Sequence, residues 1–438
     1  MPSSAPSTAA KTPHPLAHAG RALRSRNFRL YVGGQGISLI GSWMTRLALS
    51  WLTYRLTHSA LLLGLVGFAG QILTFLLAPF AGVWIDRLDR RKLLVATQAL
   101  SAVQSLALAW LTLLGVITMP EILALAAVQG LVDAFDMPAR QSFVVKMVDD
   151  KADLSNAIAL NSSMVNLARL IGPPIAAFVI SRLNEGYCFL IDGISYLAVI
   201  ASLLLMRIVD DRPSGLHRPS MLVQMKDGWS YVSTYVPVRN ILLLFSICSL
   251  AGMPYMVLMP VFATRVLHGG AHTLGLLTAA AGTGALFSAG SLAVRKTVVG
   301  LVTMIQIAAA CFGLGLILFG SSHWLWLSLP ALMLAGYGMM QGLGASNTVI
   351  QTLVPEDKRG RVMSYYTIAF VGMMPFGSLI AGGCASWIGA ADTVRLMGAV
   401  VLFGGLTFFS QRRAMRKAMR PRYEELGILQ PKITVGEG

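Results

Sequence analysis

The sequence predicts an all-α integral membrane protein with twelve transmembrane helices arranged as two six-helix halves. Of its 438 residues, 55% are hydrophobic and only 12% are charged, whereas soluble domains carry about 25% charged residues. Apolar runs recur along the whole chain, each long enough to cross a hydrocarbon core about 30 Å thick. Because lipid offers no hydrogen-bond partners, each run must satisfy its own backbone groups and is expected to be a helix.

Short polar segments separate the expected spans, and the longest of these segments divides six spans from six. The predicted limits of the spans are 30–53, 61–81, 93–115, 121–137, 156–180, 188–207, 240–263, 274–294, 301–319, 324–350, 363–388 and 393–411.

The basic residues predict the orientation of these spans. If both termini are cytoplasmic, the cytoplasmic segments hold 29 of the 35 Lys and Arg residues, and the outer loops hold only Arg55, Arg182, Arg265 and Arg395. Cytoplasmic loops are enriched in Lys and Arg, so we expect both termini on the cytoplasmic side of a bacterial inner (plasma) membrane. The net charge of +16 therefore indicates topology, and no nucleic-acid partner is expected.

The domain organisation follows from the same pattern. We expect a disordered cytoplasmic tail over 1–27, a six-helix bundle over 28–208, a linker over 209–238, a second bundle over 239–411 and a basic cytoplasmic tail over 412–438. Within the linker, residues 221–235 are compatible with an amphipathic helix at the membrane face. A weak repeat relates 144–153 to 349–358, which favours two duplicated halves with a substrate site between them.

One charged patch, Gly82-Val-Trp-Ile-Asp86-Arg87-Leu-Asp89-Arg90-Arg91-Lys92, lies between two apolar runs. It resembles the loop between the second and third helices of the major facilitator superfamily, although Asp89 stands where that loop usually has Gly. The resemblance implies a gating motif formed by Gly82, Asp86, Arg87, Arg90 and Arg91, whose charges pair across the halves. The alternative is a basic loop that only sets the orientation of the chain.

Further motifs extend the resemblance over residues 26–410. The run Asn166-Leu-Ala-Arg169-Leu-Ile-Gly172-Pro173-Pro174 is similar to the antiporter-associated motif of the superfamily, in which Gly172 and Pro173 would kink the helix; an ordinary packing kink is the alternative. Segments around Phe28, Asp136 and Arg359 resemble a branch that includes the bacterial enterobactin exporter. This likeness implies secondary active, proton-coupled export of a siderophore-like or drug-like small organic molecule by alternating access.

Charged residues inside the expected spans are candidates for function because hydrocarbon disfavours them. We expect Arg46 to bind an anionic or oxygen-rich group of the substrate, or else to form a structural ion pair. Asp133 is the first candidate for a proton carrier, and an interfacial cap that pairs with Arg140 or Arg90 is the alternative. Arg169 either lines the cavity or braces its helix. Asp192 lies near the outer surface, where it is either solvated or a coupling group. Uncharged polar residues expected in the substrate cavity include Gln35, Gln129 and Asn166.

Other classes of function find little support in the sequence. A membrane-embedded enzyme would need convergent catalytic groups or a metal cluster, and we find neither, so no cofactor and no metal are expected. The expected partners are a small-molecule substrate, protons and the lipid bilayer, with a monomer as the expected oligomeric state. An importer or uniporter of a small metabolite, or a transport-inactive membrane sensor, remains the alternative function.

Overall fold

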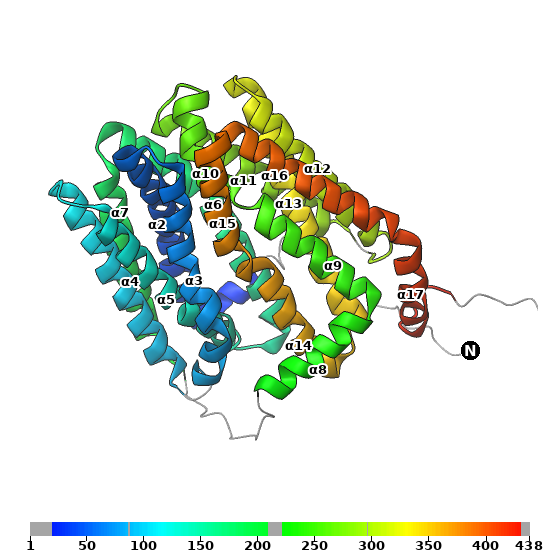
Figure 1. The fold of residues 1–438 in the computed structure, drawn as a ribbon. Coiled ribbons are helices and arrows are strands. Elements are labelled where there is room, and N and C mark those ends of the chain that lie inside the picture. The colour runs from blue at the N-terminus through cyan, green and yellow to red at the C-terminus, as the bar shows by residue number, and fades with distance from the viewer. Residues whose placement is uncertain (1–19, 86–87, 209–220, 296, 431–438) are drawn as a thin grey trace, which may run out of the picture.

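The computed structural model is almost entirely helical over the residues that it describes, namely 20–85, 88–208, 221–295 and 297–430. The predicted all-α class is thereby confirmed for these residues. Six long helices form the N-terminal group (Figure 1): α2 (Arg26–Thr57), α3 (Ala60–Ile85), α4 (Arg90–Leu113), α5 (Met119–Val144), α6 (Leu154–Arg182) and α7 (Glu185–Leu205).

The C-terminal group begins after residue 220. It contains the helices α8 (Met221–Thr234), α9 (Val236–Ile247), α10 (Tyr255–Val261), α11 (Ala271–Ala293), α12 (Leu301–Ser321), α13 (Leu325–Leu353), α14 (Glu356–Thr367), α15 (Met374–Ile388), α16 (Ala390–Ser410) and α17 (Arg412–Glu425). Three short π-helical segments join some of them: η3 (Cys248–Gly252), η4 (Phe262–Val266) and η5 (Ile368–Gly372).

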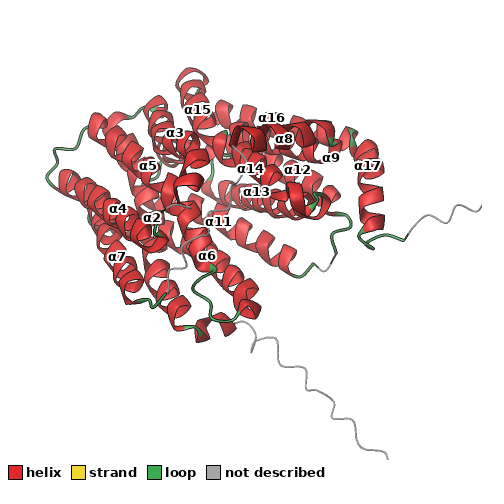
Figure 2. Ribbon diagram, turned by 90° about the horizontal axis from the view of Figure 1, so that it is seen from below, coloured by secondary structure: helices red, strands yellow, loops and turns green. Residues whose placement is uncertain are grey.

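The two groups lie side by side and meet along two helix pairs. Within the N-terminal group the closest partners are α4 with α7, α2 with α7 and α3 with α5; within the C-terminal group they are α12 with α13, α11 with α13 and α12 with α16. Contacts between the groups concentrate on α3 with α15 and on α6 with α11. Both views place these four helices between the outer helices of the two groups (Figures 1 and 2).

Ten helical segments in the described part of the chain are long and apolar enough to cross a membrane. Two of them are composite: 236–266 joins α9, η3, α10 and η4, and 356–388 joins α14, η5 and α15. Two further long helices, α2 and α13, have 32 and 29 residues and are not among these ten segments. The chain therefore has multiple membrane-spanning helices, while the count of twelve stays a prediction.

Several predicted limits were wrong. The fourth expected span, 121–137, is too short because α5 continues to Val144 with Pro138 inside it. Ordered structure also begins before residue 28: a 3₁₀ turn spans Arg21–Arg24, and Ala22 is fully buried. The Ala22 amide donates to Asn156 Oδ1 over 3.0 Å, which ties this turn to α6. The tail predicted over 1–27 is therefore folded from Arg21 onward.

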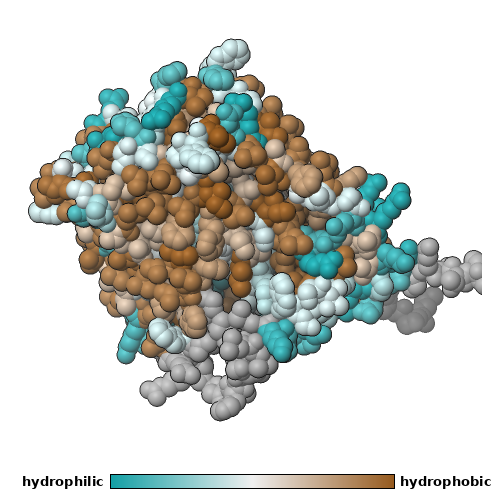
Figure 3. All heavy atoms as spheres, in the orientation of Figure 1, coloured by the Kyte–Doolittle hydropathy of each residue, from teal (hydrophilic) through white to brown (hydrophobic). Residues whose placement is uncertain are grey.

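The surface of the molecule is largely apolar. Figure 3 shows hydrophobic residues over most of the visible face, with hydrophilic residues gathered toward its ends. Large side chains such as Trp387 and Trp326 are 93% and 86% exposed. A soluble protein rarely exposes so extensive an apolar surface, so this surface is expected to be covered by lipid.

Small residues allow the two groups of helices to approach closely on one side of the molecule. We call the side where α2 begins and α16 ends the near side, and the opposite side the far side. A Cβ atom on Gly382 of α15 would lie 2.7 Å from the Ala60 carbonyl oxygen of α3. On the second pair, a Cβ atom on Gly275 of α11 would lie 2.4 Å from the Ala177 Cβ atom of α6. These contacts belong to the far halves of the helices, so the groups are closed against each other there.

Candidate functional site

Two arginines and one tryptophan lie together in the N-terminal group. The guanidinium carbon of Arg46 lies 5.2 Å from the centre of the Trp43 ring, and that of Arg169 lies 5.5 Å from it. Trp43 and Arg46 come from α2, and Arg169 comes from α6. Neither arginine forms a salt bridge with a carboxylate among the described residues. Arg46 does act electrostatically on Asp133 of α5 and Asp192 of α7, so the alternative of a structural ion pair stays a prediction.

The predicted helix-kink motif positions this cluster. Gly172 lies where α6 crosses α2, and a Cβ atom on it would lie only 2.6 Å from the Trp43 Cβ atom. Pro173 has no amide hydrogen, so the Arg169 carbonyl oxygen, four residues earlier, lacks its usual helical hydrogen bond. The same carbonyl faces α11, since a Cβ atom on Gly282 would lie 3.6 Å from it. Gly172 and Pro173 thus bring Arg169 to the boundary between the two groups.

Asp133 of α5 lies within the electrostatic reach of Arg46. Its Oδ1 atom accepts a hydrogen bond of 2.9 Å from Gln129 Nε2, one turn earlier on the same helix. The structure therefore brings three predicted residues, Arg46, Asp133 and Gln129, into one region. The alternative pairing of Asp133 with Arg140 was wrong, because the Arg140 guanidinium pairs with Asp136 instead.

Asp136 is a functional candidate that the sequence reasoning missed. Besides the ion pair with Arg140, its Oδ1 atom accepts hydrogen bonds from Thr97 Oγ1 at 2.9 Å and Gln98 Nε2 at 2.7 Å. The spacing of four residues between Asp136 and Arg140 on a helix was a signal for this pair. The two neighbouring carboxylates thus differ: Asp136 is fully compensated, whereas Asp133 has one amide donor and no ion pair within the described residues.

Asp192 is buried, not solvated as one alternative held. It is 1% exposed and lies in α7 against α2 and α4. Its carboxylate accepts from Ser42 Oγ at 3.4 Å and from Ser105 Oγ at 3.3 Å. Arg46 acts electrostatically on Asp192 as well as on Asp133. Arg46 is therefore a cation that both acids share.

Two other predicted cavity residues, Gln35 and Asn166, have no contact with the two arginines and Trp43 among the described interactions. Gln35 is buried in α2 with 3% exposure. Asn166 is half-buried and donates from Nδ2 to the Ser162 carbonyl oxygen of its own helix over 2.9 Å. Hence the structure gives neither side chain a role at the arginine cluster.

Tyr255 of α10 is a second residue that the sequence did not connect with the arginine cluster. Its side chain is fully buried, and its hydroxyl has no hydrogen-bond partner in the described part of the chain. It interacts electrostatically with Arg169. Because α10 belongs to the C-terminal group, the arginine cluster faces the boundary between the groups. Nothing in the sequence links Tyr255 to residues that lie more than 80 positions earlier in the chain.

The expected gating loop is described only in part. Asp86 and Arg87 lie outside the described residues, and Gly82 lies in the last turn of α3. Asp89 caps α4: its Oδ1 atom accepts from the backbone amides of Arg91 at 2.9 Å and Lys92 at 3.1 Å. The Arg91 guanidinium donates to the Leu204 carbonyl oxygen at the end of α7 over 2.6 Å.

Arg91 therefore forms this bond inside the N-terminal group, while Arg90 has an interaction partner of its own. Asp89 replaces the usual Gly with a side chain that satisfies two amides at the start of a helix.

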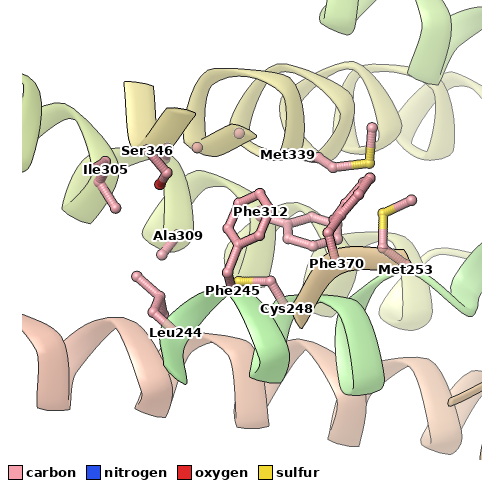
Figure 4. A pocket seen from close by; sticks show the side chains of 13 residues that line it. Leu244, Phe245, Cys248, Met253, Ile305, Ala309, Phe312, Met339, Ser346 and Phe370 are labelled. Atoms are coloured by element: carbon pink, nitrogen blue, oxygen red, sulfur yellow. The ribbon is translucent and has the colours of Figure 1, made fainter. Parts of the chain in front are cut away.

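A separate apolar pocket lies inside the C-terminal group (Figure 4). It is lined by aromatic, thioether and small side chains from α9, η3, α12, α13 and η5. In Figure 4, Phe245, Phe312 and Phe370 gather around it, with Met253 and Met339 beside them. Ser346 lies at its wall, and the Ser346 hydroxyl has no hydrogen-bond partner among the described residues. One lining residue, Phe312, packs edge-on against Tyr255, with the ring centres 6.2 Å apart.

Comparison with known proteins shows what kind of molecule carries this arrangement. Residues 19–425 match the family model described as transmembrane secretion effector. The chain belongs to this family of the major facilitator superfamily. Members of the family are membrane transporters and not enzymes, so the expectation of a transporter is confirmed.

Individual members and solved structures resemble the chain over most of its length. The staphyloferrin A transporter of Staphylococcus aureus is 26% identical, over 86% of this chain and 94% of its own length. Macrolide efflux protein A of Streptococcus pyogenes is 21% identical, over 84% and 92%. The crystal structure of the nucleoside transporter NupG superposes with a TM-score of 0.69 at 10% identity, over 89% of this chain and 99% of that one. This last likeness shows the fold alone.

Proposed function

We propose that this transporter exports a small organic molecule from the bacterial cytoplasm and that protons entering the cell are the coupling ion. Its family and the efflux protein among its relatives support export. The proposed location is the inner membrane, with both termini cytoplasmic, because 29 of 35 basic residues then lie on the cytoplasmic side.

One observation carries the proposal for protons, namely the contrast between Asp133 and Asp136. Asp136 is neutralised by Arg140 and held by two further donors. Asp133, one helical turn away, has only the Gln129 amide as a donor among the residues that the structure describes. A carboxyl group in such surroundings exchanges its proton with modest rearrangement, whereas a carboxylate in a full ion pair does not. We therefore assign the proton to Asp133 and a structural role to Asp136.

The closed far side supports a specific state in the transport cycle. If the near side faces the cytoplasm, the tight contacts of α3 with α15 and of α6 with α11 close the outer side. The structure then corresponds to a state that is closed on the outer side, and we propose that this state is open to the cytoplasm. Transport requires the two groups to rock, so that the near side closes while the far side opens.

The loop from Gly82 to Arg91 is the proposed gate on the near side. Charges that pair across the two groups would hold that side closed, and the pairs would break in the inward-open state. Arg91 bonds to α7 of its own group here, which is consistent with a gate that is not engaged. The competing role, a loop that sets orientation only, needs no such pairing.

The substrate class is proposed from the polarity of the site. Arg46 and Arg169 offer cationic groups near the boundary, which favours neutral, oxygen-rich or anionic cargo. The names of two relatives refer to a siderophore and to macrolides. Siderophore-like and drug-like compounds are accordingly the two classes to test first.

Accumulation in intact cells tests the proposal. Cells that produce the protein should accumulate less of an added catecholate siderophore or macrolide than control cells. A protonophore should abolish the difference. Unchanged accumulation of every compound, with the protein correctly inserted, would reject export. Higher accumulation would instead identify an importer, and lower accumulation that survives the protonophore would reject protons as the coupling ion.

A further inference from the structure

We propose that Arg46, Trp43, Arg169 and Tyr255 form a binding site for an organic anion at the boundary between the two groups of helices. This inference rests on the proposed function, since it names the chemical class of the cargo. The site is more specific than a cationic cavity, because it joins two guanidinium groups, one indole ring and one phenol hydroxyl from three different helices.

The first argument is the charge of the cluster. Both guanidinium groups lie near one ring, act electrostatically on each other, and lack an ion pair within the described residues. A charged group inside a membrane protein is costly unless it is paired or hydrated. Arg46 acts electrostatically on Asp133 and Asp192, whereas the electrostatic partners of Arg169 are Tyr255 and Arg46, with no acid among them. The positive charge of Arg169 is therefore left for a bound anion to neutralise.

The second argument is the geometry at Trp43. A cation above an aromatic face is held by the ring electrons, and this contact does not use the guanidinium N–H donors. A guanidinium group carries five such donors in a plane and binds oxyanions through two of them at once. Trp43 therefore holds both arginines in place while leaving their donors available. The same indole offers an apolar surface to the carbon skeleton of an organic ligand.

The third argument is Tyr255, which stands on the other side of the boundary. Its hydroxyl is fully buried, has no partner among the described residues, and lies within electrostatic reach of Arg169. Leaving such a group unsatisfied is unfavourable. An oxygen of a ligand bound to Arg169 would accept a hydrogen bond from it. The ligand would then contact both groups of helices, as a substrate must in alternating access.

Binding of simple probes to the purified protein tests the site without relying on transport. Isothermal titration calorimetry in detergent would use phthalate, benzoate and benzamide, which share one aromatic ring and carry two, one and no negative charges. We expect phthalate to bind most tightly, benzoate more weakly, and benzamide at least about tenfold more weakly than benzoate.

Substitutions assign the binding to these residues. Arg46→Gln and Arg169→Gln should each weaken phthalate binding by about tenfold or more, and Tyr255→Phe by about fivefold. The matched control is Arg182→Gln, because Arg182 also lies near an aromatic ring on α6, 5.9 Å from the centre of Phe178, but belongs to the last turn of this helix, away from Trp43. This control should bind phthalate as tightly as the natural protein does. Where a glutamine variant does not fold, the lysine variant Arg46→Lys or Arg169→Lys replaces it. The lysine keeps the positive charge but cannot bind an oxyanion through two N–H groups at once, so we expect phthalate to bind it, but more weakly than it binds the natural protein.

Several results would overturn the site. Equal affinity for benzoate and benzamide, no binding of either anion to folded natural protein, or unchanged affinity in Arg46→Gln would each do so. The experiments distinguish a failure of the anion site from a failure of the proposed export function. Anion binding without any export would support the site and reject the proposed function, whereas export that ignores the charge of the cargo would reject the site alone.

Discussion

Gly172 of α6 lies so close to Trp43 of α2 that a Cβ atom on Gly172 would lie 2.6 Å from the Trp43 Cβ atom. The contact joins the predicted kink motif to the aromatic ring between the two arginines. A glycine is required here by the approach of two helices, as is common where transmembrane helices cross. The position of Trp43, and with it the geometry of the candidate site, therefore depends on the absence of one methyl group.

Gly172→Ala should disturb both stability and binding. Adding a methyl group to this contact forces Trp43 or α6 to shift, and overpacking of this kind costs about 1–3 kcal/mol. We expect a lower unfolding temperature and weaker phthalate binding. Gly383→Ala is the matched control, since a Cβ atom on Gly383 in α15 meets nothing within 4 Å. If both variants behave alike, the Gly172–Trp43 contact is not important.

Asp136→Asn should destabilise the protein by about 3 kcal/mol or more, because it leaves the Arg140 guanidinium without its counter-charge. Chemical unfolding of the purified protein would measure the loss. The double variant with Arg140→Gln should lose much less than the sum of the two single variants, since the residues form one pair. Additive losses would contradict the pairing of Asp136 with Arg140.

Asp89→Ala should lower the free energy of unfolding by about 1 kcal/mol, because two amides at the start of α4 lose their acceptor. Asp89→Gly should cost only a few tenths of that value, since glycine is tolerated at this capping position. Thermal unfolding of the three proteins gives the order. A glycine variant that is less stable than the alanine variant would contradict the capping role.

Gly382→Val should shift the protein away from the closed far side. The added side chain would collide with Ala60 and Gly64 of α3, so the far ends separate and the near ends approach. Spin labels at Lys92→Cys and Glu356→Cys, both on the near side, would report shorter distances in a background without native cysteines. Gly383→Val should leave the distances unchanged. Unchanged distances in Gly382→Val would show that this contact does not hold the state.

Much of the fold could be predicted from the sequence because length and apolar composition determine membrane helices. The breaks inside two spans could not be predicted. Segments 236–266 and 356–388 contain π-helical turns, which no periodicity in the sequence indicates. The extension of α5 to Val144 was also missed, because Asp136 and Arg140 were treated as polar ends of a helix although they neutralise each other inside it.

The candidate site was predicted in part. Arg46, Arg169 and Asp133 stood out as charges in apolar runs, and the structure places them in one region. Tyr255 could not be linked to Arg169 from the sequence, since their electrostatic interaction joins the two halves of the chain. Asp192 was placed near solvent by its position along the span, whereas packing of α7 against α2 and α4 buries it.

The most direct test of the account is substrate-triggered proton release from inverted membrane vesicles, read by a pH-sensitive dye. Respiration acidifies the lumen, and catecholate siderophores, macrolides or aromatic carboxylates are then added outside. We predict proton release with the natural protein and with Asp392→Asn, which removes an exposed acid, but not with Asp133→Asn. Release that persists in Asp133→Asn, or no release with any compound from correctly inserted natural protein, would contradict proton-coupled export through Asp133.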